Sequence, residues 1–145
     1  MAVIAIFSPK GGVGKSTIAV NLGWCAAVRS GHHTLLWELD PQRGASYLMG
    51  EEAPARSKAV AIFAKDADPA SQIIATETPG LDLLPADDSL ISLDTFFSDL
   101  GKKRRLEKLT ATLGKNYGRV ILDCPPAMNE MDEIGVARQR VQHTA

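Results

Sequence analysis

The sequence has few cysteines and no long apolar run, and each shortage excludes a class of protein. Its 2 cysteines, Cys25 and Cys124, lie far apart and match neither a CxxC motif nor a Cys/His metal spacing. This usage argues against a disulfide framework, and we expect a chain of the reducing cytoplasm. No apolar run reaches the roughly 18 residues of a membrane span and the N-terminus has no signal-peptide pattern, so we expect no membrane partner.

Net charge is also small, because 16 Lys and Arg balance 17 Asp and Glu to leave -1. Bulk charge of that size does not attract nucleic acid, so any contact with DNA has to come from a local basic patch. The composition, 45% hydrophobic and 23% charged, excludes a disordered or collagen-like chain. A length of 145 residues fits a single domain of ordinary size.

Short apolar runs predict strands that are buried on both faces, as in a parallel sheet. They are Ala2–Phe7, Thr34–Leu39, Leu81–Leu84 and Val120–Asp123. Apolar residues recur every three or four positions from Ser16 to Arg29, which predicts a helix, and Gly31 supplies its stop. A strand–helix–strand unit of this kind is almost always a right-handed crossover between parallel strands.

Weaker helical patterns occupy the middle of the chain. They lie around Ala59–Ala64, around Pro69–Ala75, along a face from Leu90 to Leu100, and along a face made by Leu106, Leu109 and Leu113. Gly101 and the basic run Lys102–Arg105 separate the last of these from the one before it. Strands that alternate with helices in this way predict the α/β class.

A glycine-rich turn lies between the first strand and the first helix. It comprises Lys10, Gly11, Gly12, Val13, Gly14, Lys15, Ser16 and Thr17. Glycine permits positive φ and close approach, so successive N–H groups at the start of the helix can point at phosphate oxygens. Lys15 would then reach the β and γ phosphates and Ser16 would bind Mg2+. We favour this phosphate site over a turn that merely carries two solvated lysines.

The same run resembles the deviant Walker A motif of the ParA/MinD family of ATPases. Glu38–Gln42 resembles the family's Asp-x-Asp-Pro-Gln motif, Ile121–Pro126 resembles its Walker B strand, and Leu81–Ala86 resembles a segment of the ParA branch. These ordered matches cover residues 1 to about 127. The resemblance implies a three-layer P-loop NTPase-type fold with a mostly parallel sheet in residues 1–127, followed by a divergent polar tail in residues 128–145.

The resemblance also implies roles in the binding and hydrolysis of Mg-ATP. Lys15 and the amides of residues 11–17 would hold the phosphates, while Ser16 would bind the metal and Asp123 would hold it through a water. Asp40 matches the aspartate that orients or activates the attacking water. Taken alone, Asp40 would rather be interpreted as an Asp-Pro turn former, and the other motifs shift the preference to the water-orienting role. The implied cofactors are ATP and Mg2+.

Lys10 resembles the family's signature lysine, which crosses a dimer interface to the partner's nucleotide. Like an arginine finger, it adds positive charge to the transition state only when two subunits close around ATP. The resemblance therefore implies an ATP-dependent homodimer. The motifs depart from the pattern at Pro9, which replaces a glycine of the general P-loop, at Glu38, which replaces an aspartate, and at Arg43, where glycine is common. We expect Arg43 to be an exposed loop residue rather than a phosphate or partner contact.

Several other features have two interpretations. Lys102–Arg105 with Lys108 is the densest basic cluster, and it could contact DNA phosphates without sequence preference or be the solvated start of a helix. His32 and His33 indicate a surface turn. Trp24 and Trp37 are expected to pack in the core or at an interface.

Residues 128–145 are short and polar and show no strand pattern, whereas the family continues with further strands and helices. We therefore expect a fold that is incomplete at its C-terminal side, in a truncated or frame-shifted member or in a reduced variant that pairs with another chain. The implied function is an ATPase of chromosome or plasmid partitioning, cytoplasmic and associated with the nucleoid. A ParB-like activator and non-specific DNA would be its partners.

Two alternatives stay open. One is a non-hydrolysing nucleotide-binding or dimerisation module. The other is a MinD-like ATPase, which attaches to membranes through a C-terminal amphipathic helix, although residues 130–145 lack the apolar face of such a helix.

Overall fold

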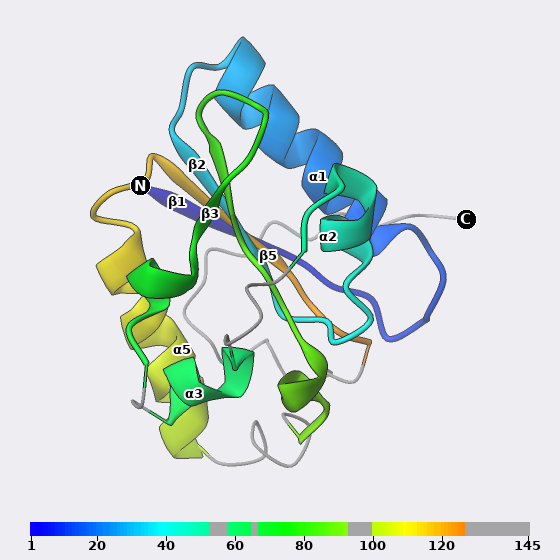
Figure 1. Ribbon diagram of the computed structural model, residues 1–145, viewed down its shortest axis with the longest axis vertical. Helices are drawn as coiled ribbons and strands as arrows, with labels where there is room; N and C mark the ends of the chain where they lie inside the picture. The colour runs from blue at the N-terminus through cyan, green and yellow to red at the C-terminus, as the bar shows by residue number, and fades with distance from the viewer. Residues whose placement is uncertain (53–57, 65–66, 93–99, 127–145) are drawn as a thin grey trace.

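A mostly parallel sheet forms the centre of the computed structural model, which describes residues 1–52, 58–64, 67–92 and 100–126 (Figure 1). The strands are β1 (Ala2–Ile6), β2 (Thr34–Glu38), β3 (Ile74–Ala75), β4 (Leu81–Leu84) and β5 (Arg119–Asp123). Their order is β1-β5-β2-β4-β3, with β3 antiparallel to β4 and the other pairs parallel. The predicted strands and their parallel direction are confirmed.

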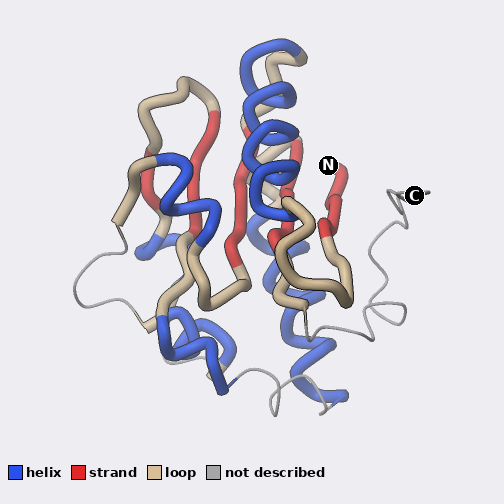
Figure 2. The backbone as a smooth tube through the Cα atoms, turned by 90° about the vertical axis from the view of Figure 1, so that its right-hand side faces the viewer, coloured by secondary structure: helices blue, strands red, loops and turns tan. Residues whose placement is uncertain are grey.

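Helices cover both faces of this sheet, which confirms the predicted three layers. They are α1 (Lys15–Trp24), which continues into the π-helical turn η1 (Cys25–Arg29), then α2 (Gly44–Met49), α3 (Ala59–Phe63) and α5 (Leu100–Leu113). Figures 1 and 2 show α1 and α2 on one side of the strands and α3 and α5 on the other. Gly31, at φ 66°, follows η1 as the predicted stop. In the described part of the chain, every helix is too short or too polar to cross a bilayer.

The alternation of side chains along the central strands explains why both faces are covered. Leu35 and Trp37 of β2 point into the core that includes Leu109 of α5, whereas Leu36 between them points into the core that includes Ala19 of α1. Trp37 also stacks on Phe63 of α3, with ring centroids 5.8 Å apart. Burial of a Leu side chain contributes about 1.5–3 kcal/mol to the free energy of folding. Because β2 places side chains in both cores, it stabilises the helices on both faces of the sheet.

Some elements differ from their predictions. Residues 69–75 do not form one helical segment: Asp68 caps a 3-10 turn, η2 (Pro69–Gln72), and β3 then pairs with β4. From Ile74 on the backbone is extended rather than helical, because Ile74 pairs with Leu83 in the antiparallel β3–β4 ladder. Trp24 is 44% exposed, which excludes the core and leaves the interface as its expected place.

The basic run is the other difference. The helix α5 (Leu100–Leu113) includes Gly101 and the basic run, so the run does not separate helical segments as predicted, and its interpretation as the start of a helix is confirmed. Leu106, Leu109 and Leu113 are buried at the spacing predicted for its apolar face. Of the predicted face from Leu90 to Leu100, residues 93–99 lie outside the described residues, and Leu90 sits in a 3-10 turn, η3 (Asp88–Ser92).

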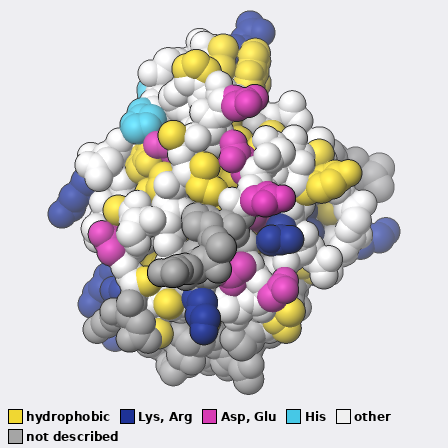
Figure 3. Space-filling model, viewed as in Figure 1, with side chains coloured by type: hydrophobic (Ala, Val, Ile, Leu, Met, Phe, Trp, Pro, Cys, Tyr) yellow, Lys and Arg dark blue, Asp and Glu magenta, His cyan; other side chains and the backbone are white. Residues whose placement is uncertain are grey.

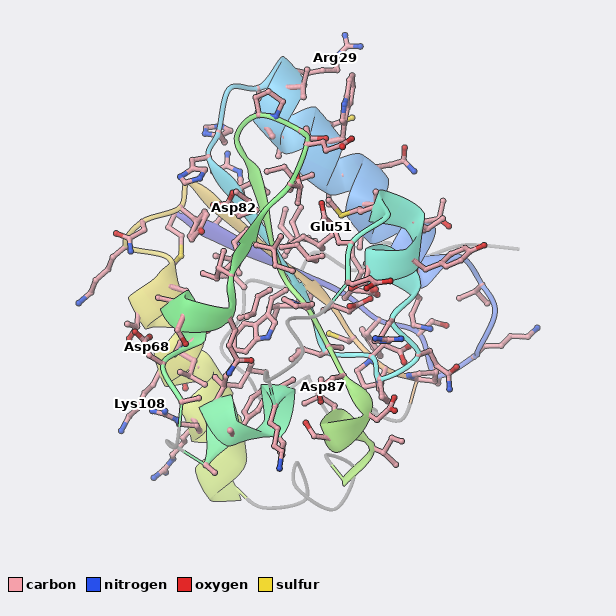
Figure 4. All side chains as sticks on the ribbon, viewed as in Figure 1. Arg29, Glu51, Asp68, Asp82, Asp87 and Lys108 are labelled. Carbon is pink, nitrogen blue, oxygen red and sulfur yellow. The ribbon has the colours of Figure 1, made fainter. Side chains whose placement is uncertain are left out.

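A polar cluster joins chain segments at the start of the central strands, the end of the sheet away from the glycine-rich turn. Asp82 Oδ2 accepts a hydrogen bond from the Tyr117 hydroxyl at 2.8 Å and lies 3.0 Å from His33 Nε2. Burial, with the Asp82 carboxylate beside it, raises the pKa of Tyr117. Figure 4 shows Asp82 and Asp87 near opposite ends of β4. His33 is exposed in its turn, as predicted, but it also ties that turn to β4.

The Tyr117 hydroxyl offers a test of this cluster. We expect Tyr117→Phe to lower the free energy of unfolding by about 1–2 kcal/mol, because the lost bond has a charged acceptor. Urea denaturation would measure the change. Tyr47→Phe is the matched control, since Tyr47 is 85% exposed and its variant should be neutral. Equal values for the two variants would show that the Asp82 bond does not stabilise the fold.

Candidate nucleotide-binding site

The glycine-rich turn connects the end of β1 to the start of α1 and is the blue loop of Figure 1. Gly12 and Gly14 have φ of 71° and 83°, the left-handed region that glycine adopts without the steric cost of a Cβ. Gly14 is also the N-cap of α1, so the unpaired N–H groups of the first helical turn lie beside it. The turn has the backbone geometry that a phosphate site requires.

The two lysines of the turn have opposite environments. Lys15 is only 7% exposed and its ammonium interacts electrostatically with Asp123. Lys10 is exposed, and its backbone N–H donates to Ser8 Oγ at 3.2 Å. Lys15 is therefore placed inside the site, while Lys10 lies on the outer surface of the turn. The separate roles predicted for the two lysines stay predictions.

Asp123 ends β5 at the centre of the sheet, level with Ile6 of β1 and Glu38 of β2. The residue has 0% exposure, and neither carboxylate oxygen has a hydrogen-bond partner among the described residues. Burial raises the pKa of Asp123 to about 6, and Glu38 and Asp40 act in the same direction, against the nearby Ser16 hydroxyl and Lys15 ammonium. A buried carboxylate without a donor is costly and indicates a ligand that the protein itself does not supply.

Asp40 follows β2 at the same end of the sheet and is 7% exposed. Its Oδ1 accepts a hydrogen bond from Gln42 N at 3.0 Å, and its carbonyl accepts one from Arg43 N at 3.0 Å. The turn-forming role is therefore present. No described residue donates to Oδ2, so that oxygen is available for the water-orienting role as well.

Glu38 is the site residue for which the sequence analysis gave no role. It is fully buried in β2, where its carboxylate accepts hydrogen bonds from Ser46 N at 3.0 Å and from Ala86 N at 3.1 Å. The Ser46 hydroxyl donates to it as well. An acidic residue inside an otherwise apolar strand was the available signal, because a buried carboxylate has to find donors.

The polar side chains at the phosphate turn suit Mg2+ bound together with phosphate and water better than a metal ion bound by protein ligands alone. The described residues contain no group of three or more His, Cys, Asp or Glu side chains that could hold a metal ion. Mg2+ is usually bound through one or two carboxylates together with water and phosphate oxygens. Ser16 and the unpartnered Asp123 carboxylate supply that kind of set at the phosphate turn, whereas an all-protein cage would need more ligands.

Comparison with known proteins identifies the family of this chain. Residues 1–138 match the family described as AAA domain. The chain belongs to that family. The Soj sporulation initiation inhibitor of Bacillus subtilis is 37% identical over 87% of this chain, and the chromosome partitioning protein ParA of Caulobacter vibrioides is 34% identical over 89%. The ParA/MinD resemblance of this AAA domain is thereby confirmed.

A solved structure shares its fold. The cobyrinic acid a,c-diamide synthase of Mycobacterium smegmatis, with bound ATP analogue and magnesium, superposes with a TM-score of 0.77 at 28% identity over 87% of this chain. The match covers 50% of that protein, 50% of Soj and 49% of ParA. This chain thus spans about half the length of the relatives that it matches.

The start of α2 lies against the glycine-rich turn in this AAA domain. Arg43, its N-cap, has φ 56°, a left-handed value that explains why glycine suits this position. Arg43 is exposed, as predicted. A Cβ added to Gly44 would lie 2.7 Å from Ser16 Oγ. Gly44 therefore allows α2 to approach the predicted metal-binding hydroxyl.

The basic cluster lies elsewhere. Arg104 and Lys108 are exposed on α5, while Arg105 Nη2 donates to Ile62 O at 3.1 Å and so satisfies a carbonyl at the end of α3. Figure 4 shows Lys108 on the outer side of α5, and Figure 3 shows acidic and basic side chains interspersed on the same view. The side chains of Lys102 and Lys103 lie outside the described part of the chain. Contact with DNA through this cluster stays a prediction.

The raised pKa of Asp123 predicts a stability effect. A pKa raised from 3.8 to about 6 means that the folded state favours the proton, so this stabilisation is present below pH 4 and is lost as pH rises through 6. We expect Asp123→Asn, without metal, to be more stable than the parent above pH 6 by up to about 3 kcal/mol.

Urea denaturation at pH 4 and pH 7 would measure this difference. Near pH 4 the advantage of Asp123→Asn should nearly vanish, because the parent carboxyl is then protonated. Asp88→Asn, at an exposed site, is the control and should show no such dependence. A difference that does not change with pH would contradict the electrostatic origin of the effect.

Proposed function

We propose that residues 1–127 form the N-terminal part of a ParA-like ATPase domain that binds and hydrolyses Mg-ATP. The observation that carries the proposal is the buried Asp123 carboxylate, without a hydrogen-bond donor, beside Lys15 and Ser16 at a turn built to bind phosphate. The cobyrinic acid a,c-diamide synthase that shares this fold holds an ATP analogue and magnesium, which supports the choice of ligand.

The residues divide the work of phosphoryl transfer, which needs positioning and charge stabilisation more than covalent chemistry. The amides of residues 11–17 and the Lys15 ammonium bind the phosphates. Ser16 and, through a water, Asp123 would hold Mg2+. Bound Mg2+ would neutralise charge on the β and γ phosphates. Asp40, with its free Oδ2, orients the attacking water.

The cellular role that we propose is DNA partitioning in the cytoplasm, at the nucleoid. Two relatives by sequence, Soj and ParA, support this role, since ParA is named as a chromosome partitioning protein. The partners would be a second copy of the chain, a ParB-like activator and non-specific DNA. The exposed position of Lys10 suits a contact with a second copy.

Asp40→Ala tests the catalytic assignment. We expect turnover of ATP to fall by about 10²-fold or more, because a positioned base contributes that much, while nucleotide affinity stays within about twofold. Steady-state phosphate release and titration with a fluorescent ATP analogue measure the two quantities. Asp88→Ala is the control.

The outcomes separate the hypotheses. Binding without Asp40-dependent turnover would indicate the non-hydrolysing module. If the parent chain binds no nucleotide in the presence of Mg2+, the proposed function is wrong for this chain.

Lys10→Ala tests the dimeric mechanism. Loss of a cation supplied in trans should lower turnover by about 10³-fold and abolish the ATP-dependent shift to a dimer, while each subunit still binds ATP through Lys15. Analytical ultracentrifugation with and without ATP measures the shift, with exposed Lys115→Ala as control. Unchanged dimerisation and turnover in Lys10→Ala would remove Lys10 from the mechanism.

A further inference from the structure

We propose that Glu38 is a positioning residue, which acts through α2 and Gly44 on Ser16 and so sets the geometry of the Mg2+ site. The part of this proposal that concerns Mg2+ rests on the proposed function. The link from Glu38 to Ser16 is a property of the protein alone and can be tested without nucleotide.

Two carboxylates that lie side by side have opposite hydrogen-bonding states. Glu38 and Asp123 are register partners in β2 and β5, and both have 0% exposure. Glu38 Oε1 accepts from Ser46 N, and Oε2 accepts from the Ser46 hydroxyl and from Ala86 N. The oxygens of Asp123 have no described donor. Glu38 is therefore occupied with protein donors, and Asp123 is the carboxylate left open for a cation.

The bonds from Ser46 to Glu38 fasten α2 to the end of β2, in addition to its packing on α1. Gly44 precedes Ser46 by two residues in this short helix, and its added Cβ would lie 2.7 Å from Ser16 Oγ and 3.0 Å from Ser16 Cβ. Real Cβ atoms essentially never lie 2.7 Å from another heavy atom, so the helix lies closer to Ser16 than a residue with a Cβ would permit without a shift. A displacement of α2 of a few tenths of an ångström would change the space around the Ser16 hydroxyl.

The bond to Ala86 extends the same constraint to the other helical layer. Ala86 follows β4, and the next residue, Asp87, accepts a hydrogen bond from Ala59 N at 2.7 Å at the start of α3. Figure 4 shows Asp87 at this end of the strands. Glu38 thus joins α2 on one face of the sheet to the segment that holds α3 on the other. An aspartate, one methylene shorter, would reach less far across this span.

Both carboxylate oxygens of Glu38 are needed as hydrogen-bond acceptors, since Ser46 N donates to one and Ala86 N to the other. A glutamine at position 38 has a single acceptor oxygen and an NH2 group, so it cannot accept from both Ser46 N and Ala86 N on its two sides. A buried N–H without a partner is costly, and α2 or the Ala86 segment would move to relieve it. Such movement is transmitted to Ser16 through Gly44.

The first measurement uses the nucleotide-free protein. We expect Glu38→Gln and the milder Ser46→Ala to shift the backbone amide NMR signals of Lys15, Ser16 and Thr17, whereas Glu52→Gln, at an exposed glutamate, leaves them in place. Ser46→Ala removes one hydroxyl and keeps the fold testable if Glu38→Gln does not fold. Shifts confined to α2 and the Ala86 segment would overturn the link to Ser16.

The second measurement is the gain in affinity for a fluorescent ATP analogue when Mg2+ replaces EDTA. We expect Glu38→Gln and Gly44→Ala to reduce this gain by about tenfold, the usual loss when a residue that orients a metal ligand is changed. Affinity in EDTA should stay within about twofold, as should both values for Glu52→Gln. A merely structural role would lower both affinities together, and that result would overturn the proposal.

The two measurements also separate this inference from the proposed function. If the parent chain binds no nucleotide but the signals at Ser16 still move in Ser46→Ala, the proposed function fails and the link from Glu38 to Ser16 stands. If the parent shows a Mg2+-dependent gain that Gly44→Ala and Glu38→Gln both retain, the function stands and the positioning role is wrong.

Discussion

The position of β5 between β1 and β2 is the constraint on which the rest of the site depends. Parallel pairing on both sides places Asp123 level with Ile6 and Glu38. The pairing continues beyond the strand, where Leu39 N donates to Asp123 O at 2.9 Å and Cys124 N donates to Ile6 O at 3.1 Å. The phosphate turn leaves the sheet just after Ile6 and the Asp40 loop leaves just after Glu38. One register therefore brings both loops to the Asp123 carboxylate.

Charge at this edge of the sheet is unbalanced. Glu38, Asp40 and Asp123 are all buried within a short distance of a single buried ammonium, that of Lys15. Burying carboxylates is costly unless donors or cations compensate. Ser46 and Ala86 offset that cost for Glu38, whereas the nearby Ser16 hydroxyl and Lys15 ammonium offset it only in part for Asp123, whose pKa stays raised. Without a ligand this edge of the sheet is therefore destabilising, and a bound divalent cation would offset that cost.

Local sequence signals were sufficient for much of this fold and site. Apolar runs predicted the strands, and the spacing of glycines and lysines predicted the phosphate turn with Lys15 and Ser16, because both depend on neighbouring residues. The resemblance to the family's motifs pointed to Asp123 and Asp40, and their places at or just after the ends of predicted strands agree with where ligands of parallel sheets bind. The failures came from long-range contacts. The helix α2 and the role of Glu38 depend on Ser46 and Ala86, which lie 8 and 48 positions along the chain from Glu38.

The sequence by itself determined the chemistry that this protein can offer: a glycine turn with an anion-binding helix start, a lysine and a hydroxyl beside it, and acidic residues at strand ends. These are properties of residue type and near neighbours. Only the tertiary structure decided which acid is satisfied and which is open, because the donors to Glu38 come from residues 8 and 48 positions away. It also decided that Gly44 lies against Ser16, a contact that depends on how α2 packs on α1.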